Sequence, residues 1–260
     1  MNAAGRPLGE SRSALRATAP VTRPALQVAL QQGAAELGLA LTDAQIHQLL
    51  DYLRLLEKWG KVYNLTALHA PREMLTHHLL DSLGVIAPLR RHFAHSGHHS
   101  AARLLDVGSG AGLPGAVVAM CCPELSVDCV DAVAKKAAFI QQVAVSLRLH
   151  NLHGVHARVE KLKGEYDVVV SRAFASLADF TRLSANALAQ GGAWLAMKGT
   201  QPTDEMAALP SQMQVFHVEQ LEVPGLGAQR CLVWLHRGPA NQPILAGAGP
   251  TGAFRLKLRK

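Results

Sequence analysis

Residues Leu104 to Gly115 read L-L-D-V-G-S-G-A-G-L-P-G, an apolar run that leads into closely spaced glycines. This pattern predicts a buried strand that turns tightly into a helix, because glycine allows positive φ and close backbone approach. Pro114 lies near the predicted start of the helix, where a missing N–H is tolerated. The amides at such a helix start are expected to point toward the polar atoms of a bound cofactor. The stretch therefore predicts an α/β fold with a cofactor site after this strand.

Two cofactors are compatible with the glycine turn. The run Gly110-Ala-Gly112-Leu-Pro-Gly115 matches G-x-G-x-x-G, the pattern of dinucleotide-binding folds. Asp106 favours a different ligand, because a carboxylate beside the turn would repel a pyrophosphate and attract a cation. S-adenosylmethionine carries a sulfonium and an ammonium group. We therefore favour S-adenosylmethionine over a dinucleotide, and either cofactor over a purely structural turn.

The chain from about residue 102 onward alternates short apolar strands with helices, which predicts a mostly parallel sheet with right-handed crossovers. Strands are expected at residues 103–107, 126–131, 154–157, 167–171 and 193–198, with helices at about 114–122, 134–149 and 176–189. Two late strands, at about 213–222 and 229–236, are joined by Pro224-Gly225-Leu226-Gly227 and predict an antiparallel hairpin. Seven strands with a terminal hairpin are typical of a Rossmann-like class I S-adenosylmethionine-dependent methyltransferase, whereas a dinucleotide fold more often continues strand–helix to its end.

An N-terminal helical appendage, residues 25–100, is expected to precede the methyltransferase domain at 101–237. Helices are predicted at about 24–37, 43–59 and 71–86, and residues 91–102, which hold four histidines, are expected to form a polar loop. Residues 1–24 are expected to be a disordered basic extension and residues 238–260 a basic tail. These two ends carry an excess of three and four positive charges, which together make the whole net charge of +7. They would act as phosphate-binding arms or only aid solubility.

Composition excludes several classes of protein. No apolar run reaches the length of about 20 residues that spans a membrane, and the N-terminus lacks the apolar core of a signal peptide. Four cysteines without a C-x-x-C pair lie among apolar residues and are expected to be reduced core residues. The histidines between His77 and His99 lack regular metal-ligand spacing, so no metal is expected. These features predict a cytoplasmic protein that is not attached to a membrane.

Polar residues follow several of the predicted strands, at the edge where open parallel sheets bind ligands. Asp131 is expected to accept hydrogen bonds from ribose hydroxyls, or else to cap the helix that follows. Val159-Glu160 would read the edge of an adenine, although an acid at a helix start is also favoured by the helix dipole. Arg172 is expected to pair with a substrate phosphate or a cofactor carboxylate, unless it pairs with Asp167 or Glu160. Lys198 ends another strand and faces the same edge.

Longer blocks elsewhere in the chain are more specific than the glycine turn. They are W-G-K-V-Y-N-L-T-A at 59–67, H-H-L-L-D-S-L at 77–83, S-R-A-F-A-S-L at 171–177 and M-K-G at 197–199. Together with the glycine turn, these blocks resemble the bacterial small-subunit ribosomal RNA guanine-N7 methyltransferases (RsmG), a family also called glucose-inhibited division protein B. The resemblance covers roughly residues 35–237 and leaves out most of the two basic ends.

The resemblance implies methyl transfer from S-adenosylmethionine to N7 of guanine 527 of 16S rRNA, in the small ribosomal subunit or its precursor. The protein is expected to act as a monomer. The family's cofactor contacts correspond to Gly108, Leu113, Val159, Glu160 and Arg172, and the strand-end reasoning adds Gly110 and Asp131. Two other functions stay open, a nicotinamide-dependent oxidoreductase and an RNA-binding protein that kept the fold without catalysis.

The implied reaction needs no proton-transfer base, because guanine N7 carries a free lone pair and no proton. The contribution of the protein should then be orientation, proximity and suitable electrostatics. Arg172 and Lys198 are the candidates for positioning the substrate, and Asn64 is a weaker candidate for contacting the edge of the base.

Overall fold

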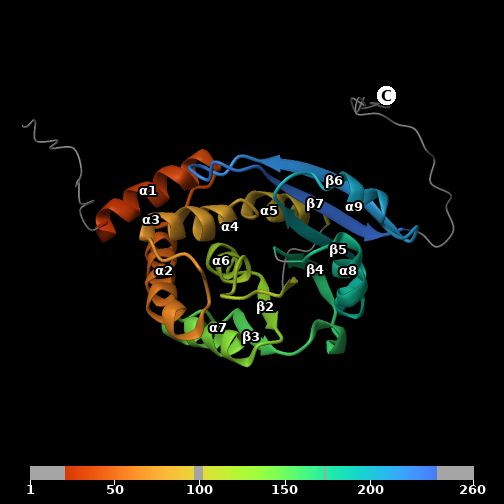
Figure 1. Cartoon of the computed structure of the whole chain (residues 1–260), viewed down its shortest axis with the longest axis horizontal. Coiled ribbons are helices and arrows are strands. Elements are labelled where there is room, and N and C mark those ends of the chain that lie inside the picture. The colour runs from red at the N-terminus through yellow and green to blue at the C-terminus, as the bar shows by residue number, and fades with distance from the viewer. Residues whose placement is uncertain (1–20, 97–101, 173, 239–260) are drawn as a thin grey trace, which may run out of the picture.

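The computed structural model describes residues 21–96, 102–172 and 174–238. Its centre is a seven-stranded sheet in the order β3-β2-β1-β4-β5-β7-β6 (Figure 1). The strands are β1 (Arg103–Val107), β2 (Ser126–Asp131), β3 (Leu152–His156), β4 (Tyr166–Ser171), β5 (Leu188–Lys198), β6 (Met213–Leu221) and β7 (Arg230–Arg237). Strands β1 to β5 pair in parallel, and β7 runs antiparallel to both of its neighbours. This topology confirms the predicted Rossmann-like class I methyltransferase fold and its hairpin.

Helices cover both faces of the sheet. The elements that follow β1 in the chain are α6 (Gly115–Cys121), α7 (Ala134–Leu147), η2 (Val159–Lys161), α8 (Leu177–Ser184), η3 (Ala185–Ala187) and α9 (Thr203–Ala207). Side chains of successive strand residues join two different hydrophobic clusters: Leu104 and Val168 belong to one, Leu105 and Val169 to the other. Because strand side chains alternate between faces, the two clusters are the cores on opposite sides of the sheet. Helices α6 and α7 pack in the first, and α8 packs in the second.

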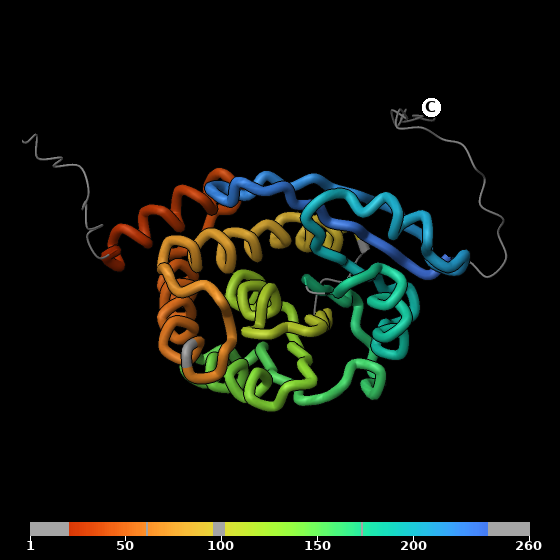
Figure 2. Tube along the Cα trace, viewed as in Figure 1, coloured from red at the N-terminus to blue at the C-terminus, as the bar shows by residue number. Residues whose placement is uncertain are grey.

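The N-terminal helices form an outer layer over α6 and α7, on the left and top of Figures 1 and 2. They are α1 (Arg23–Glu36), α2 (Asp43–Tyr63), α3 (Pro71–Met74), the π-helix η1 (Leu75–Leu80), α4 (Asp81–Leu83) and α5 (Ile86–Ser96). Helix α2 begins with a Thr42 capping box and packs against α6 and α7. Its buried residues share one hydrophobic cluster with the strands. The helical region and the sheet therefore have a common core.

Two predictions about the N-terminal helices need correction. The helix expected at 71–86 is present as an uninterrupted helical run, but it ends at Leu83 and its middle, Leu75–Leu80, is a π-helix with about one extra residue per turn. The segment expected to be a polar loop at 91–102 is helical as far as Ser96. The His92 ring stacks on Trp234 of β7 with centroids 4.7 Å apart, and Phe93 is buried. Tertiary packing thus makes this polar run one face of an amphipathic helix.

The described residues also bear on the predictions about cysteines, membrane spans and metal ligands. All four cysteines are buried and unpaired, as expected of core residues. Within the described ranges no helix combines the length and apolarity needed to cross a membrane, and no cluster of side chains there could hold a metal ion. Residues 1–20 and 239–260, which include most of both predicted basic ends, and His98 and His99 lie outside the described residues.

Candidate active site

The glycine turn between β1 and α6 is closed by its own hydrogen bonds. The amides of Gly108 and Ser109 donate to the Val130 carbonyl at 2.9 and 3.2 Å, and those of Gly112 and Leu113 donate to the Ser109 carbonyl at 2.8 and 3.0 Å. The expectation that the amides at the helix start point toward a cofactor is therefore wrong. Contacts to a ligand must therefore come from other atoms of the turn or from the walls beside it.

Asp106 is completely buried beneath the start of α6. Its Oδ2 accepts a hydrogen bond from the Gly115 amide at 2.8 Å, whereas its Oδ1 has no partner in the part of the chain that the structure describes. A Cβ at Gly115 would collide with the Cys129 sulfur, so only glycine lets the helix start lie this close to the strands. Burial raises the pKa of Asp106 to about 7. The carboxylate thus anchors α6 instead of facing a ligand, which corrects the argument drawn from its place in the sequence.

A cavity of about 370 Å³ opens beside the glycine turn, at the carboxyl ends of β1 and β2. Four of the predicted cofactor contacts line it: Gly108, Asp131, Val159 and Glu160. The other three, Gly110, Leu113 and Arg172, are not part of its lining. The side chain of Leu113 is buried in the core, so any contact that it makes with a ligand would come from its backbone.

Asp131 connects the glycine turn to the start of α7. Its Oδ2 accepts from the Gly110 amide at 3.1 Å and lies 3.6 Å from Lys136 Nζ, while its Oδ1 accepts from the Val133 amide at 2.9 Å. The carboxylate thus bonds the amide of the N-cap residue Val133 and lines the cavity, but it does not cap α7, which has no side-chain cap.

The residues around the cavity suit S-adenosylmethionine. Gly108 and Gly110 have φ values of 67° and 59°, and nothing lies within 4 Å of where their Cβ atoms would be. The turn therefore leaves space for a ligand where other residues would place side chains. Two carboxylates, those of Asp131 and Glu160, and the Arg158 side chain line the cavity, and Lys136 lies beside Asp131.

Arg172, directly after β4, pairs with an acid that the sequence reasoning missed. Its Nη1 donates to the His77 carbonyl at 3.1 Å and to Asp81 Oδ2 at 3.3 Å. Asp81 lies on α4, far earlier in the chain, and is buried. Asp81 belongs to the H-H-L-L-D-S-L block, which marked it as a possible functional residue. No rule of sequence spacing connects it to Arg172.

The four blocks that carry the family resemblance meet at the carboxyl ends of β4 and β5. Thr66 Oγ1 and His78 Nε2, 2.8 Å apart, join the first block to the second. The ion pair between Asp81 and Arg172 joins the second to the third. Lys198 Nζ donates to a carbonyl of the third block at 3.3 Å and so joins it to the fourth. Segments far apart in the sequence thus form one continuous polar structure.

The remaining predicted residues differ in how accessible they are. Lys198 Nζ donates to both oxygens of Glu205 on α9, at 3.0 and 2.8 Å, and its side chain is 13% exposed. Neither α9 nor this partner was predicted. Asn64 is exposed and ends α2 in the left-handed conformation, with φ of 52°. His78 is buried, and desolvation lowers its pKa to about 4, so that it is neutral near pH 7.

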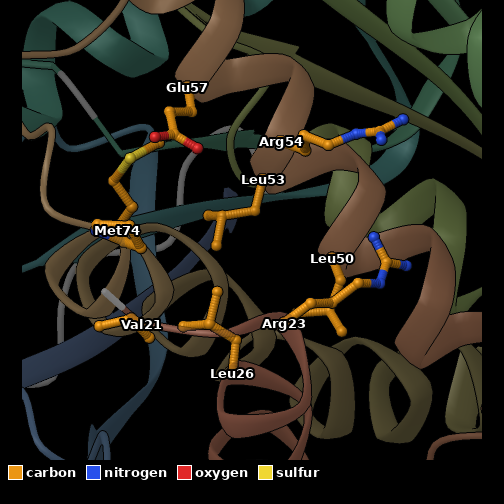
Figure 3. A pocket seen from close by; sticks show the side chains of 9 residues that line it. Val21, Arg23, Leu26, Leu50, Leu53, Arg54, Glu57 and Met74 are labelled. Carbon is orange, nitrogen blue, oxygen red and sulfur yellow. The ribbon is translucent and has the colours of Figure 1, made fainter. Parts of the chain in front are cut away.

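A second cavity, of about 450 Å³, lies between α1, α2 and α3. Figure 3 shows Leu26, Leu53 and Met74 around it, with Arg54 extending away from its centre. None of the predicted site residues is in its lining. The cavity beside the glycine turn is therefore the better candidate for the cofactor.

Comparison with known proteins identifies the family of this chain. The family model described as "rRNA small subunit methyltransferase G" matches residues 45–233. A protein of Acidovorax ebreus named ribosomal RNA small subunit methyltransferase G is 65% identical over 219 residues, which is 83% of this chain and 97% of that protein. A protein of the same name from Paracidovorax citrulli is 60% identical over 236 residues, covering 88% of this chain and 97% of the relative.

Among solved structures, TrmN from Thermus thermophilus is similar with a TM-score of 0.49 and 18% identity, over 63% of this chain and 53% of that one. The family assignment rests on the sequence matches, which span the helical region and the sheet. The blocks that converge on β4 and β5 all lie within the matched range. The chain belongs to the rRNA small subunit methyltransferase G family.

Proposed function

We propose that this protein transfers the methyl group of S-adenosylmethionine to N7 of guanine 527 in 16S rRNA of the small ribosomal subunit or its precursor. The observation that carries the proposal is the contact among the four family blocks, of which the third contributes Phe174 to the lining of the cavity at the glycine turn. The name shared by the relatives supports a ribosomal RNA substrate. The atom and the nucleotide rest on the family resemblance of the blocks.

In this proposal the cavity beside the glycine turn binds S-adenosylmethionine, which supplies a methyl group on a cationic sulfur. Asp131 accepts hydrogen bonds from the ribose hydroxyls, as acids after the second strand do in related folds. The Val159 backbone and the Glu160 carboxylate contact the adenine. Gly108 and Gly110 give the ligand room, and Arg172, together with the Leu113 backbone, completes the contacts on the side nearest β4.

The residues of the chain orient the reactants and move no proton. Because N7 attacks with a free lone pair, the in-line approach of the base is what the protein must enforce. Arg172, fixed by the buried Asp81, positions the substrate from the end of β4. Lys198 holds the Phe174 carbonyl and thereby the loop after β4, and the exposed Asn64 contacts the edge of the base. The target guanine must leave its stack to reach this position.

The proposal is tested by incubating the protein with small subunits that lack the modification and with S-adenosylmethionine labelled in its methyl group. Label is expected in 16S rRNA at N7 of guanine 527, where chain scission specific for N7-methylguanine locates it. Subunits with adenine at position 527 serve as the control and should stay unlabelled. Absence of label in the guanine subunits, or label at another position, would refute the proposal.

A further inference from the structure

The carboxylate of Asp81 forms ion pairs with two arginines, Arg172 and Arg230. Its Oδ2 accepts from Arg172 at 3.3 Å, and its Oδ1 accepts from Arg230 Nε at 2.8 Å. The Asp81 side chain is 3% exposed, whereas that of Arg230 is 24% exposed. The Arg172 side chain is 27% exposed, so one buried negative charge faces two positive charges that both reach solvent. Such a cluster has an excess positive charge and favours an anion as an additional partner.

Arg230 lies at the edge of the sheet where the family blocks meet. It is the first residue of β7 and comes just before Cys231, which pairs with Lys198 at the end of β5. The guanidinium is held in place by Asp81 and by a bond from Nη1 to the Gln229 carbonyl at 2.9 Å. A fork fixed in this way is suited to phosphate, because less side-chain freedom is lost on binding.

A groove of about 610 Å³ begins at Arg230 and runs between the loop after β5 and the loop that joins β6 to β7. Three exposed amide side chains line it, those of Gln201, Gln220 and Gln229. Amides both donate and accept hydrogen bonds, so they match base edges and ribose 2′-hydroxyls. Glu222 also lines the groove and follows Leu221, the residue of β6 that pairs with Arg230.

From this arrangement we infer that the groove binds RNA next to the target guanine, with Arg230 on a phosphate and the glutamine amides on the neighbouring nucleotide. This inference rests on the proposed function, because it places the groove beside the reacting base. Arg230 then contacts the RNA next to the reacting base, while Arg172 contacts the cofactor and positions that base. Asp81 fixes both and is a positioning residue.

The test compares Arg230→Met with Arg237→Met in the full-length protein. Arg237 ends the same strand, is exposed and lies at the opposite edge of the sheet, so its replacement removes the same charge away from the groove. Initial methylation rates on unmodified small subunits give KM and kcat, and calorimetry gives the affinity for S-adenosylmethionine. We expect Arg230→Met to raise KM for the subunits about tenfold, with kcat and cofactor affinity within about twofold of wild type. Arg237→Met should leave all three values unchanged.

The salt dependence of subunit binding gives an independent readout. Loss of one phosphate contact should flatten the slope of log Kd against log salt by about 0.7 for Arg230→Met and leave it unaltered for Arg237→Met. The inference is overturned if KM and the slope are unchanged. It is also overturned if the affinity for S-adenosylmethionine falls by the same factor as KM rises. If Arg230→Met is poorly folded, Gln201→Ala in the exposed loop takes its place and is judged in the same way. We expect it to raise KM about threefold. If wild type binds subunits without methylating them, the proposed function fails, and the binding slopes still decide about the groove.

Discussion

Tyr52 connects the N-terminal helices to the cofactor turn through a single hydrogen bond. Its side chain is fully buried on α2, and its hydroxyl donates to the Ala111 carbonyl at 2.9 Å, within the glycine turn. Tyr52→Phe keeps the ring but leaves that carbonyl without its donor. An unsatisfied buried carbonyl costs about 1–3 kcal/mol. We expect the free energy of unfolding to fall by this amount and the affinity for S-adenosylmethionine to fall about fivefold, because the turn is held less firmly.

Urea unfolding measures the first effect and calorimetric titration with S-adenosylmethionine measures the second. Tyr166→Phe is the matched control. Tyr166 is the first residue of β4, at the opposite edge of the sheet, and its hydroxyl donates to Asp128 Oδ2 at 2.5 Å. That variant should also lose stability but bind the cofactor as wild type does. Equal cofactor affinity in both variants would show that the contact between Tyr52 and Ala111 stabilises the fold without positioning the turn.

Three further predictions concern individual side chains. Asp131→Ala should weaken binding of S-adenosylmethionine at least tenfold by calorimetry, and normal binding would contradict the ribose assignment. Burial lowers the pKa of His78 from its ordinary value of 6.5 to about 4 in the folded protein. The side chain therefore favours the native state above pH 6.5, and this contribution, on the order of 3 kcal/mol, is lost as the pH falls toward 4. The stability of His78→Gln from urea unfolding at about pH 5 and 7 should therefore depend less steeply on pH than that of wild type, and parallel curves would refute the shift. Glu205→Gln should weaken the hold on Lys198 and lower kcat on small subunits severalfold without changing cofactor affinity; an unchanged kcat would show that the pair has no part in positioning.

The strands could be predicted from the sequence where apolar runs are bounded by turn residues. The bounds of β1 and β2 agree with the prediction at every position, because both strands are buried in the middle of their runs. Strand β5 begins at Leu188, earlier than expected, because Gly191 and Gly192 interrupt its apolar pattern. A register shift between Tyr166 and Val168 of β4 accommodates this irregular start. Such a shift depends on the neighbouring strand and leaves no local signal.

The candidate site could be predicted only in part. Residues after the strand ends, such as Asp131 and Glu160, were found because parallel strands present them at one edge. The partners of Arg172 and Lys198 were not found, since ion pairs between distant segments follow from the tertiary fold. Asp106 shows the same limit in another form: its place at the end of β1 was evident, but its burial under α6 depends on how closely Gly115 approaches Cys129.

The central claim is that the nucleophile is N7 of guanine 527 and that the protein only positions it. The most direct measurement compares small subunits reconstituted with guanine at position 527 and subunits with 7-deazaguanine there, in which a C–H replaces N7. Methyl transfer from labelled S-adenosylmethionine is followed in a single turnover, and binding of both subunits is measured in parallel. We predict label in the guanine subunits and none in the 7-deazaguanine subunits, although the two bind alike. Label in the 7-deazaguanine subunits would contradict the account.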